Sequence, residues 1–448
     1  METYASRFIF RGYILHERTS TIDFRYTIEH AHNTVDFVEK LTLADVSLPS
    51  KDSSNILLNR ILEQIHLLLG ISYWKLYCLQ DINTVPLTLT KDQAQFWNIV
   101  YTKGLGEFYY KNQIDFRGLV RFPYDENAAS DPIATGMTDQ SLVQLGGGKD
   151  SIVTAELLKK HAKDFTLVCV DDRLVHHVIA KRIGKPLICV KRTIDARLFE
   201  LNRLPGTYNG HIPISAIYAF VDLLVASLGG YRYIVASNEE SANYGNVTYL
   251  GEEINHQWSK SLEFEILFQD YVRRFVTPDI TYFSLLRPLR EVKIMELFSR
   301  YGQYFDGFTS CNTNFRIDGR DSGKVWCGNC PKCAFVFLLL SAFIPKKKLI
   351  AIFGRNLYMD SSLAQTFREL LGLVGIKPFE CVGTPEESRY ALYRASQTGE
   401  YEAEPLFVTL RNELKDQWEN ITSTEQNLFV ASSHHRIPEV FQNILKHI

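Results

Sequence analysis

The feature that most constrains the fold is the stretch from residue 141 to residue 160, in which three consecutive glycines separate two apolar segments. Residues 141–145 are short and apolar, which predicts a buried strand, and residues 149–160 carry apolar side chains at helical spacing. The glycines, Gly146–Gly148, allow positive φ and a close approach of the backbone to a ligand. A strand, a glycine turn and a helix start together present N–H groups to an anion, so this stretch predicts a phosphate site.

The glycine turn differs from two common nucleotide motifs. A Walker A loop needs Gly-Lys-Ser/Thr after a longer spacer, and the dinucleotide fingerprint has its third glycine later. The segment Gly146-Gly-Gly-Lys-Asp150-Ser151 instead resembles the Ser-Gly-Gly-x-Asp-Ser loop of the PP-loop ATP pyrophosphatases, with Gly146 in place of the usual serine. This resemblance implies cleavage of ATP between its α and β phosphates and transfer of AMP to a substrate oxygen. A plain glycine turn into a helix is the other interpretation.

Length and composition limit the class of protein. A chain of 448 residues with 46% hydrophobic residues predicts two or three domains with sizeable cores. The net charge of −2 gives no reason to expect a nucleic acid or an anionic membrane as partner. The first residues lack a signal-peptide layout, and the longest apolar run, residues 334–344, is too short to span a membrane. We therefore expect a cytoplasmic protein.

The chain before the glycine turn predicts a separate N-terminal domain. Residues 7–43 alternate apolar and polar side chains in three runs, which is typical of antiparallel strands, and residues 54–69 form an amphipathic helix. Residues 125–139 lack periodicity and are interpreted as a linker. We expect an α+β domain over residues 1–135, in which Gly104–Phe108 is interpreted as a structural connector.

From Ser141 onward, strand-like and helix-like segments alternate. Such alternation predicts an α/β domain, a parallel sheet with helices on both faces, and ligands at the carboxyl ends of its strands. We expect this PP-loop ATP-binding domain over residues 136–345 and a mainly helical region over residues 346–448. The predicted strands are residues 165–170, 187–190 and 233–236, and the predicted helices are residues 149–160, 174–183 and 212–228.

Acidic residues follow two of these strands and should border the glycine turn. Asp171 is placed to touch a ribose or base, and Glu239 is placed to hold magnesium; a solvated loop residue is the alternative for each. The polar segment 241–260, which contains His256 and Lys260, predicts a substrate-facing loop. His256 alone is also typical of a structural hydrogen-bonding residue.

Four of the eight cysteines form the second strong signal. Cys311, Cys327, Cys330 and Cys333 give two CxxC steps that share a cysteine, plus one distant thiol. Four thiolates on a tight knuckle suit a structural tetrahedral zinc ion. An iron–sulfur cluster and four unrelated thiols are the alternatives. The other cysteines are scattered, which is typical of buried thiols.

Two families resemble this chain. The glycine turn with its cysteines resembles the 7-cyano-7-deazaguanine synthases over the middle of the chain. A resemblance that runs nearly end to end is to the UDP-N-acetylmuramoyl-L-alanyl-L-glutamate epimerases of bacterial peptidoglycan synthesis. It rests on Gly104-Leu-Gly-Glu-Phe, Gly146-Gly-Gly-Lys-Asp-Ser, Asn209-Gly-His-Ile-Pro, Ser237-Asn-Glu, Asn255-His-Gln-Trp-Ser-Lys, Tyr282-Phe-Ser-Leu-Leu-Arg-Pro, Trp326-Cys-Gly-Asn-Cys-Pro-Lys-Cys, Ile352-Phe-Gly-Arg-Asn-Leu, Pro378-Phe-Glu-Cys-Val-Gly and His435-Arg-Ile-Pro.

The epimerase resemblance implies an ATP- and magnesium-dependent isomerase. Its reaction would convert the terminal L-Glu of UDP-MurNAc-L-Ala-L-Glu to D-Glu through an acyl-adenylate, releasing AMP and diphosphate. It also implies a functional link to a muramoyl ligase that adds L-Glu. The chemistry is reasonable, because a free carboxylate resists removal of its α-proton, whereas an acyl-adenylate lets the resulting charge spread onto a carbonyl.

Roles for individual residues follow as hypotheses. Gly146–Ser151 would hold the β and γ phosphates. Lys149, with magnesium on Asp150 or Glu239, would offset charge at the α-phosphate.

The epimerisation step also needs a base on one face of Cα and an acid on the other. His256, Lys260 and Cys381 are the candidates. Arg287 and Arg355 are expected to clamp the UDP diphosphate or the γ-carboxylate of glutamate.

Two other interpretations stay open at this point. One is a carboxylate-adenylating synthetase or amidotransferase, in which a nucleophile traps the adenylate. The other is a non-catalytic nucleotide-sensing or zinc-scaffold protein. The sequence does not define the oligomeric state or the order of deprotonation and diphosphate release.

Overall fold

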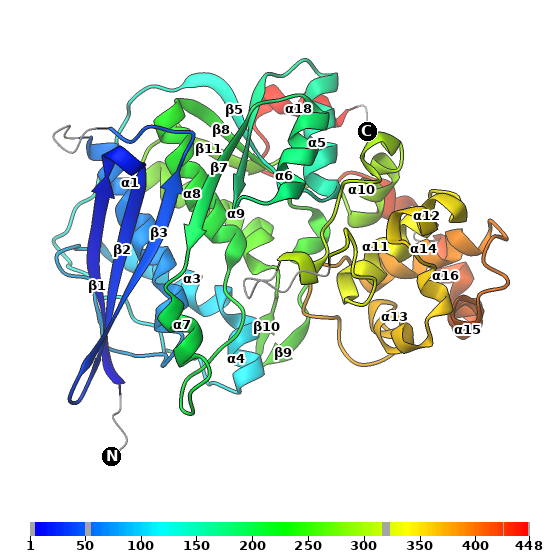
Figure 1. Ribbon diagram of the computed structural model, residues 1–448, viewed down its shortest axis with the longest axis horizontal. Coiled ribbons are helices and arrows are strands. Elements are labelled where there is room, and N and C mark those ends of the chain that lie inside the picture. The colour runs from blue at the N-terminus through cyan, green and yellow to red at the C-terminus, as the bar shows by residue number, and fades with distance from the viewer. Residues whose placement is uncertain (1–4, 50–54, 316–322, 424, 447–448) are drawn as a thin grey trace.

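One nine-stranded sheet forms the centre of the protein (Figure 1). The computed structural model describes residues 5–49, 55–315, 323–423 and 425–446. A separate ribbon pairs β9 (Val247–Tyr249) with β10 (Glu252–Ile254). The strand order in the main sheet is β11 (Thr281–Ser284), β8 (Tyr231–Ala236), β5 (Thr138–Gln144), β6 (Phe165–Val170), β7 (Leu187–Thr193), β3 (Thr34–Leu43), β2 (Thr21–His30), β1 (Ala5–His16) and β4 (Ile82–Asn83).

The strands from β11 to β7 are parallel, as the alternating sequence pattern predicted. The connections between them include α5 (Lys149–Lys160), α6 (Leu174–Ile183) and α8 (Ile214–Gly229), and α9 (Leu262–Phe275) precedes β11. The predicted helices at residues 149–160 and 174–183 coincide with α5 and α6. The expectation of an α/β fold with a parallel sheet is therefore confirmed.

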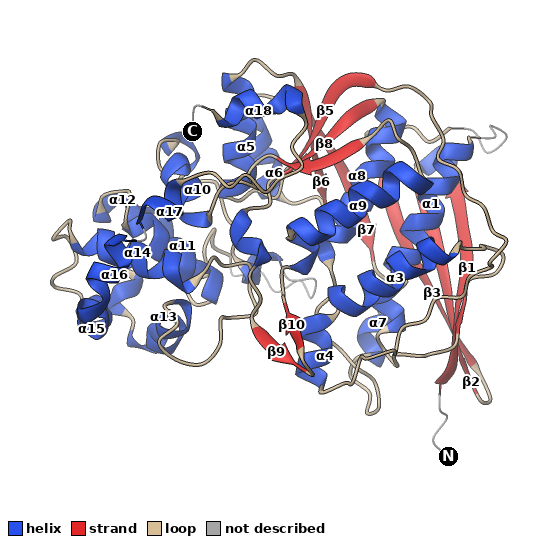
Figure 2. Ribbon diagram, turned by 180° about the vertical axis from the view of Figure 1, so that it is seen from behind, coloured by secondary structure: helices blue, strands red, loops and turns tan. Residues whose placement is uncertain are grey.

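Helices cover both faces of the parallel strands, because successive side chains of a strand point to opposite faces. Leu142 of β5 packs into a core with α8, α1 (Ile56–Leu69), α3 (Lys91–Gly104) and α9 (Leu262–Phe275). Its neighbour Val143 packs into a second core with α5, α6, α10 (Glu291–Phe298) and α11 (Pro331–Ser341). Figure 1 shows α5 and α6 on one face, and Figure 2 shows α8 and α9 on the other.

The three N-terminal strands are antiparallel, as predicted, and they extend the parallel sheet. β3 pairs antiparallel with β7, with Leu43 opposite Val190. Residues 1–135 and 136–345 thus contribute strands to one continuous sheet. The helix predicted from residue 54 begins at Ile56, after Asn55 caps it by accepting the Leu58 N–H at 2.9 Å; Ser54 lies outside the described residues.

The region after residue 345 is a helical lobe beside the sheet domain (Figure 1). Its last helix, α18 (Glu439–Leu445), returns to the sheet, where the Phe441 ring lies 4.9 Å from that of Phe283. The other helices are α2 (Ile71–Trp74), α4 (Gly106–Asn112), α7 (Ala196–Leu201), α12 (Lys346–Phe353), α13 (Ala364–Leu370), α14 (Pro385–Ser396), α15 (Pro405–Leu414), α16 (Trp418–Ser423) and α17 (Glu425–Phe429).

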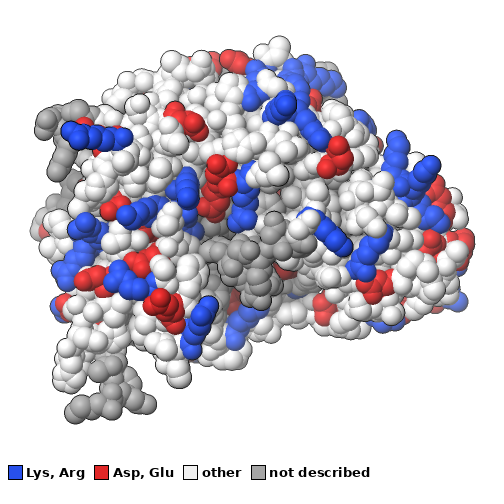
Figure 3. All heavy atoms as spheres, viewed as in Figure 1, with Lys and Arg blue, Asp and Glu red and all other residues white. Residues whose placement is uncertain are grey.

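Two features of the described residues bear on possible partners: the length of the apolar helices and the distribution of charge on the face shown in Figure 3. No helix in the described part of the chain is long and apolar enough to cross a bilayer. On that face, Lys and Arg side chains are interspersed with Asp and Glu.

A buried ion pair joins the antiparallel strands to the parallel ones. Arg192 of β7 donates from Nε to Oε1 of Glu39 on β3 at 2.6 Å, and from Nη2 to the Ser72 hydroxyl at 3.1 Å. Both charged side chains are almost fully buried. Loss of one partner would therefore leave an uncompensated charge inside the protein.

We expect Glu39→Ala to lower the free energy of unfolding by about 3–5 kcal/mol, because Arg192 would lose its counter-charge without regaining water. Urea denaturation monitored by circular dichroism measures this change. The control is Asp81→Ala, which removes the partner of Arg7 in an exposed pair and should leave the midpoint unchanged. Equal effects of the two substitutions would contradict the prediction.

Candidate active site

A cavity of about 310 Å³ opens at the carboxyl ends of the parallel strands, where the sequence pattern placed the ligand site. Its walls come from segments far apart in the sequence. They include the turn after β5, the end of β6, the start of α8 and the residues after β8. Lys260, Lys332 and Cys381 complete the wall.

The glycine turn forms part of this wall and requires glycine at its centre. Gly147 has φ +79°, and a Cβ added there would lie 2.7 Å from Cγ2 of Val175. Gly148 precedes the first residue of α5, so the N-terminal N–H groups of that helix face the turn. At Gly146 an added Cβ would meet no atom within 4 Å, so the serine of related PP-loops would fit.

Lys149 lies behind the wall and not on it. Its ammonium donates to Asp150 Oδ1 at 2.5 Å and to Glu291, and its side chain is only 2% exposed. Burial disfavours the ammonium, but Asp150, Glu291 and Glu239 together outweigh that effect and raise the pKa of Lys149. Lys149 is absent from the described residues that line the cavity.

The other predicted nucleotide contacts divide between wall and interior. Asp150, Ser151 and Asp171 line the cavity, and the Ser151 hydroxyl donates to the Gly148 carbonyl at 3.1 Å. Asp171 has φ +67°, and burial raises its pKa. Glu239, at 2% exposure, lies beneath the wall and electrostatically supports Lys149 and Lys260.

The three predicted acid–base residues form one cluster. Lys260 and Cys381 line the cavity, whereas His256 does not, and Cys381 interacts electrostatically with both of the others. Burial opposes a thiolate, but Lys260, then His256, and then Lys332 lower the pKa of Cys381 well below its usual range. Burial also opposes the imidazolium, but Cys381 and Glu107 raise the pKa of His256 to about 9. The cluster therefore favours an imidazolium–thiolate pair.

Glu107 is a member of this site that sequence analysis missed, because Gly104–Phe108 was interpreted as a connector. It lies in α4, and its carboxylate accepts from Nδ1 of His256 and, at 2.5 Å, from Lys111. Nδ1 of His211 lies 3.5 Å from the same carboxylate. Burial alone would raise the pKa of Glu107, but His256 and its other cationic neighbours lower it to about 2. The signal that could have found Glu107 is its place in the epimerase-like motif string.

The expectation that two arginines clamp the UDP diphosphate or the γ-carboxylate of glutamate is wrong for Arg287, which has a structural role, and stays a prediction for Arg355, whose side chain is partly exposed. Arg287 is fully buried and donates to Glu265 at 3.0 Å, to the Glu239 carbonyl at 2.7 Å and to the Lys260 carbonyl at 2.5 Å. Arg355 donates from Nη2 to the Gly328 carbonyl at 2.8 Å.

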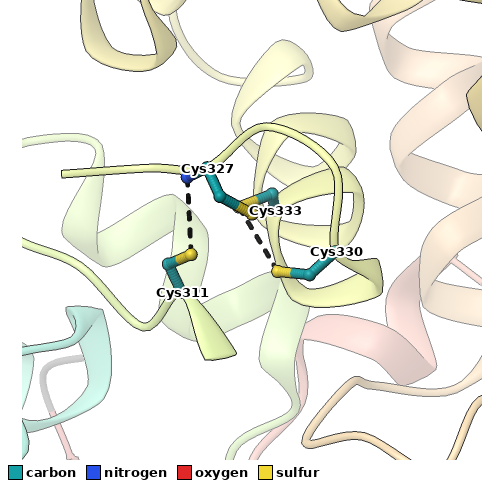
Figure 4. Close-up of side chains that lie close together, drawn as sticks. All are labelled: Cys311, Cys327, Cys330 and Cys333. Atoms are coloured by element: carbon teal, nitrogen blue, oxygen red, sulfur yellow. Dashed lines mark hydrogen bonds between the residues drawn. The ribbon is translucent and has the colours of Figure 1, made fainter. Parts of the chain in front are cut away.

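The four predicted metal-binding cysteines converge (Figure 4). Their sulfur atoms all lie within 4.8 Å of one another, with Cys327 and Cys333 at 3.7 Å and Cys330 and Cys333 at 3.4 Å. A tetrahedral ion with Zn–S bonds of about 2.3 Å separates its sulfurs by roughly 3.8 Å, so the four thiols fit one zinc ion. The cysteines of an iron–sulfur cubane bind different irons and would be farther apart.

The cysteine knuckle, Cys311 with Cys327–Cys333, is attached to the cavity. The Thr309 N–H donates to the Gly147 carbonyl at 3.0 Å, just before Cys311. Lys332, between two of the cysteines, donates to the main-chain carbonyl of Cys381 and lines the cavity. The knuckle therefore braces both the glycine turn and the acid–base cluster.

Comparison with known proteins accounts for nearly the whole chain. The profile of the MurL N-terminal domain matches residues 1–285, and that of the MurL C-terminal domain matches residues 307–425. A UDP-N-acetyl-alpha-D-muramoyl-L-alanyl-L-glutamate epimerase of Xanthomonas oryzae pv. oryzae is 39% identical over 84% of this chain and 83% of its own. The proteins of the same name from Micromonospora sp. and Salinispora tropica are 35% and 37% identical, over 98% and 86% of this chain and 97% and 84% of theirs.

These matches confirm the resemblance on which the sequence interpretation rested. The chain belongs to the MurL family, an isomerase family whose named relatives are UDP-N-acetyl-alpha-D-muramoyl-L-alanyl-L-glutamate epimerases.

Proposed function

We propose that this protein inverts the terminal L-Glu of UDP-MurNAc-L-Ala-L-Glu to D-Glu through an acyl-adenylate, with release of AMP and diphosphate. The names of the relatives support the substrate. The observation that supports the mechanism is that the glycine turn, Lys260 and Cys381 all line one cavity. A nucleotide and an activated carboxylate would thus meet the proton-transfer groups in the same space.

Adenylation solves an electrostatic problem. Removing the α-proton of a carboxylate puts a carbanion beside an existing negative charge. An acyl-adenylate has no charge on the acyl group, so the carbanion is delocalised onto the carbonyl oxygen. Inverting one stereocentre among several is nearly thermoneutral, so ATP is needed to activate the carboxylate and not to drive the inversion. Hydrolysis of the adenylate then makes the whole reaction irreversible.

Different residues around the turn would bind different parts of the nucleotide. The N–H groups of Gly146–Ser151 and the start of α5 would bind the β and γ phosphates. Asp171 would contact the ribose or base. Lys149, held behind the wall, would offset the negative charge of Asp150 and Glu291 beneath the phosphates.

Magnesium fits the acidic residues beneath the turn. Asp150 or Glu239 would hold it, since carboxylate oxygens are its preferred ligands and Asp150 lines the cavity, with Glu239 beneath it. When bound, magnesium would neutralise charge on the transferring phosphate.

Proton transfer would fall to the cluster of His256, Lys260 and Cys381, of which Lys260 and Cys381 line the cavity. The cysteine knuckle would hold a structural zinc ion, because four thiolates leave no open coordination position. We place the reaction in the cytoplasm, where ATP is supplied, after a muramoyl ligase that adds L-Glu.

The main alternative is a synthetase or amidotransferase that resembles 7-cyano-7-deazaguanine synthase. It shares the adenylation half-reaction but ends in a new bond to a nucleophile. The fate of the adenylate therefore separates the two functions.

We expect the L,L-substrate in heavy water with ATP and magnesium to give D-Glu with deuterium at Cα, together with AMP and diphosphate. Without ATP the chirality should not change, because the α-proton is removed only from the adenylate. Chiral chromatography with mass spectrometry measures both results. Inversion at full speed without nucleotide, or an amide product, would contradict the proposal.

Asp150→Asn should lower the rate of AMP release by about 10²–10³-fold, because it removes a charge that holds magnesium at the phosphates. The matched control is Asp164→Asn, at an exposed aspartate paired with Lys185. The control should release AMP at the wild-type rate. Equal rates for Asp150→Asn and wild type would argue against the assigned nucleotide site.

The purified protein should contain about one zinc ion per chain, and Cys330→Ser should lower both the zinc content and the thermal midpoint, because one of four ligands is lost. Elemental analysis and a thermal scan check this. Cys78→Ser, at a buried cysteine outside the knuckle, should keep its zinc. A brown protein rich in iron would refute the zinc assignment.

A further inference from the structure

Two sequence motifs with no assigned role meet at His256. Gly104–Phe108 supplies Glu107, and Asn209–His211 supplies His211, whose ring centroid lies 4.4 Å from that of His256. These segments lie more than a hundred residues apart in the sequence, with His256 farther still along the chain. The fold thus places Glu107 and His211, which have no role in the proposed reaction so far, next to the imidazole of His256.

The contacts of this imidazole form a chain that ends at the cavity. Nδ1 of His256 bonds the carboxylate of Glu107, and the neighbouring Gln257 amide donates to the Val382 carbonyl at 3.1 Å, which brings the imidazole close to Cys381, with which it interacts electrostatically. Cys381 lines the cavity together with the glycine turn, whereas Glu107 is 5% exposed and does not line it. The order from the interior to the cavity is therefore carboxylate, imidazole, thiol.

We propose that the Cys381 thiolate exchanges the α-proton of the adenylated glutamate on one face of Cα, with His256 as its charge partner and Glu107 as a positioning residue. This inference rests on the proposed function. In the step, the Cα–H electron pair moves into the Cα–C bond, the carbonyl oxygen gains the charge, and the sulfur takes the proton. The reverse transfer returns a proton from the thiol to Cα.

Charge in the surroundings explains why Glu107 is needed. The thiolate and imidazolium lie among several cations, and His211 stays neutral because burial lowers its pKa to about 3. Glu107 is the carboxylate bonded directly to His256, so it holds the proton on the ring and fixes the ring's orientation. The other charged or titratable groups that face this pair are Lys260, Lys332, Lys377, Glu380 and, through Glu107 or His211, Lys111 and Lys75.

The compactness of the cluster limits it to one face of the substrate. Lys260 and Cys381 line the cavity, and the segment that carries His256 is attached to the one that carries Cys381, because the Gln257 amide donates to the Val382 carbonyl at 3.1 Å. All three residues therefore lie on one side of the cavity. They cannot lie on both sides of one carbon atom. Cys381, which both of the others stabilise as an anion, is the member suited to act as the base.

The first test separates proton exchange from adenylation. Cys381→Ala and Cys381→Ser should retain ATP–diphosphate exchange with the L,L-substrate but invert glutamate about 10²–10⁴-fold more slowly. Inversion within tenfold of wild type would overturn the inference, as would a parallel loss of adenylation. An acyl-thioester on Cys381, seen by denaturing mass spectrometry of wild type, would also overturn it, since the thiol would then be a nucleophile.

The same measurements distinguish this inference from the proposed function. If the wild-type protein shows no ATP–diphosphate exchange with the L,L-substrate, the adenylation mechanism itself fails. If that exchange is normal and both Cys381 variants invert glutamate normally, only the role of the thiol fails.

The second test addresses Glu107 through the pH profile of kcat/KM. The active pair needs protonated His256, so the rate should fall as the pH rises through its pKa. Glu107→Gln removes the charge that helps to raise this pKa, so the alkaline limb should move to lower pH, and Glu107→Asp should move it back. The control is Glu252→Gln, at an exposed glutamate of β10 beside α4, which should leave the profile in place. An unmoved profile in Glu107→Gln would refute the positioning role.

Discussion

The geometry of the cavity depends on one buried guanidinium. Arg287 has no exposed surface, and it donates to the main-chain carbonyls of Glu239 and Lys260 while Glu265 balances its charge. Because one guanidinium bonds both carbonyls and the Glu265 carboxylate, it holds the loop after β8 against the segment before α9. The position of Lys260 beside Cys381 follows from this constraint.

The site also shows why charged groups are buried here at all. Isolated charges in an apolar interior are costly, yet Lys149, Lys332, Glu239 and Glu291 are each at most 5% exposed. Each is offset by a neighbour of opposite sign, and Lys149 is surrounded by three carboxylates. Such an arrangement is pre-organised, so the phosphate and magnesium that we propose as ligands would meet charges that are already in place.

Sequence patterns predicted the local elements well and the long-range contacts poorly. Apolar periodicity located α5 and α6 at their observed limits, because burial of one helix face is encoded within a dozen residues. Nothing local encodes that β3 pairs with β7, or that Glu107 reaches His256 across 149 residues of sequence. Arg287 illustrates the converse error, since an arginine beside a proline gives no sign of whether its partner is a ligand or a buried glutamate.

The cysteine knuckle contacts the cavity through Lys332, a contact that the spacing of the cysteines in the sequence does not reveal. Four thiolates bound to one metal ion would close the loop between Cys327 and Cys333, and would fix the direction of Lys332, the residue inside that loop. It points to the carbonyl of Cys381, beside the thiol that Lys260 and His256 stabilise as an anion. A metal ion that never touches the substrate would thus set the position of a cation next to the sulfur that we propose as the base. Under that proposal, a single lysine connects the structural metal site to the site of proton transfer.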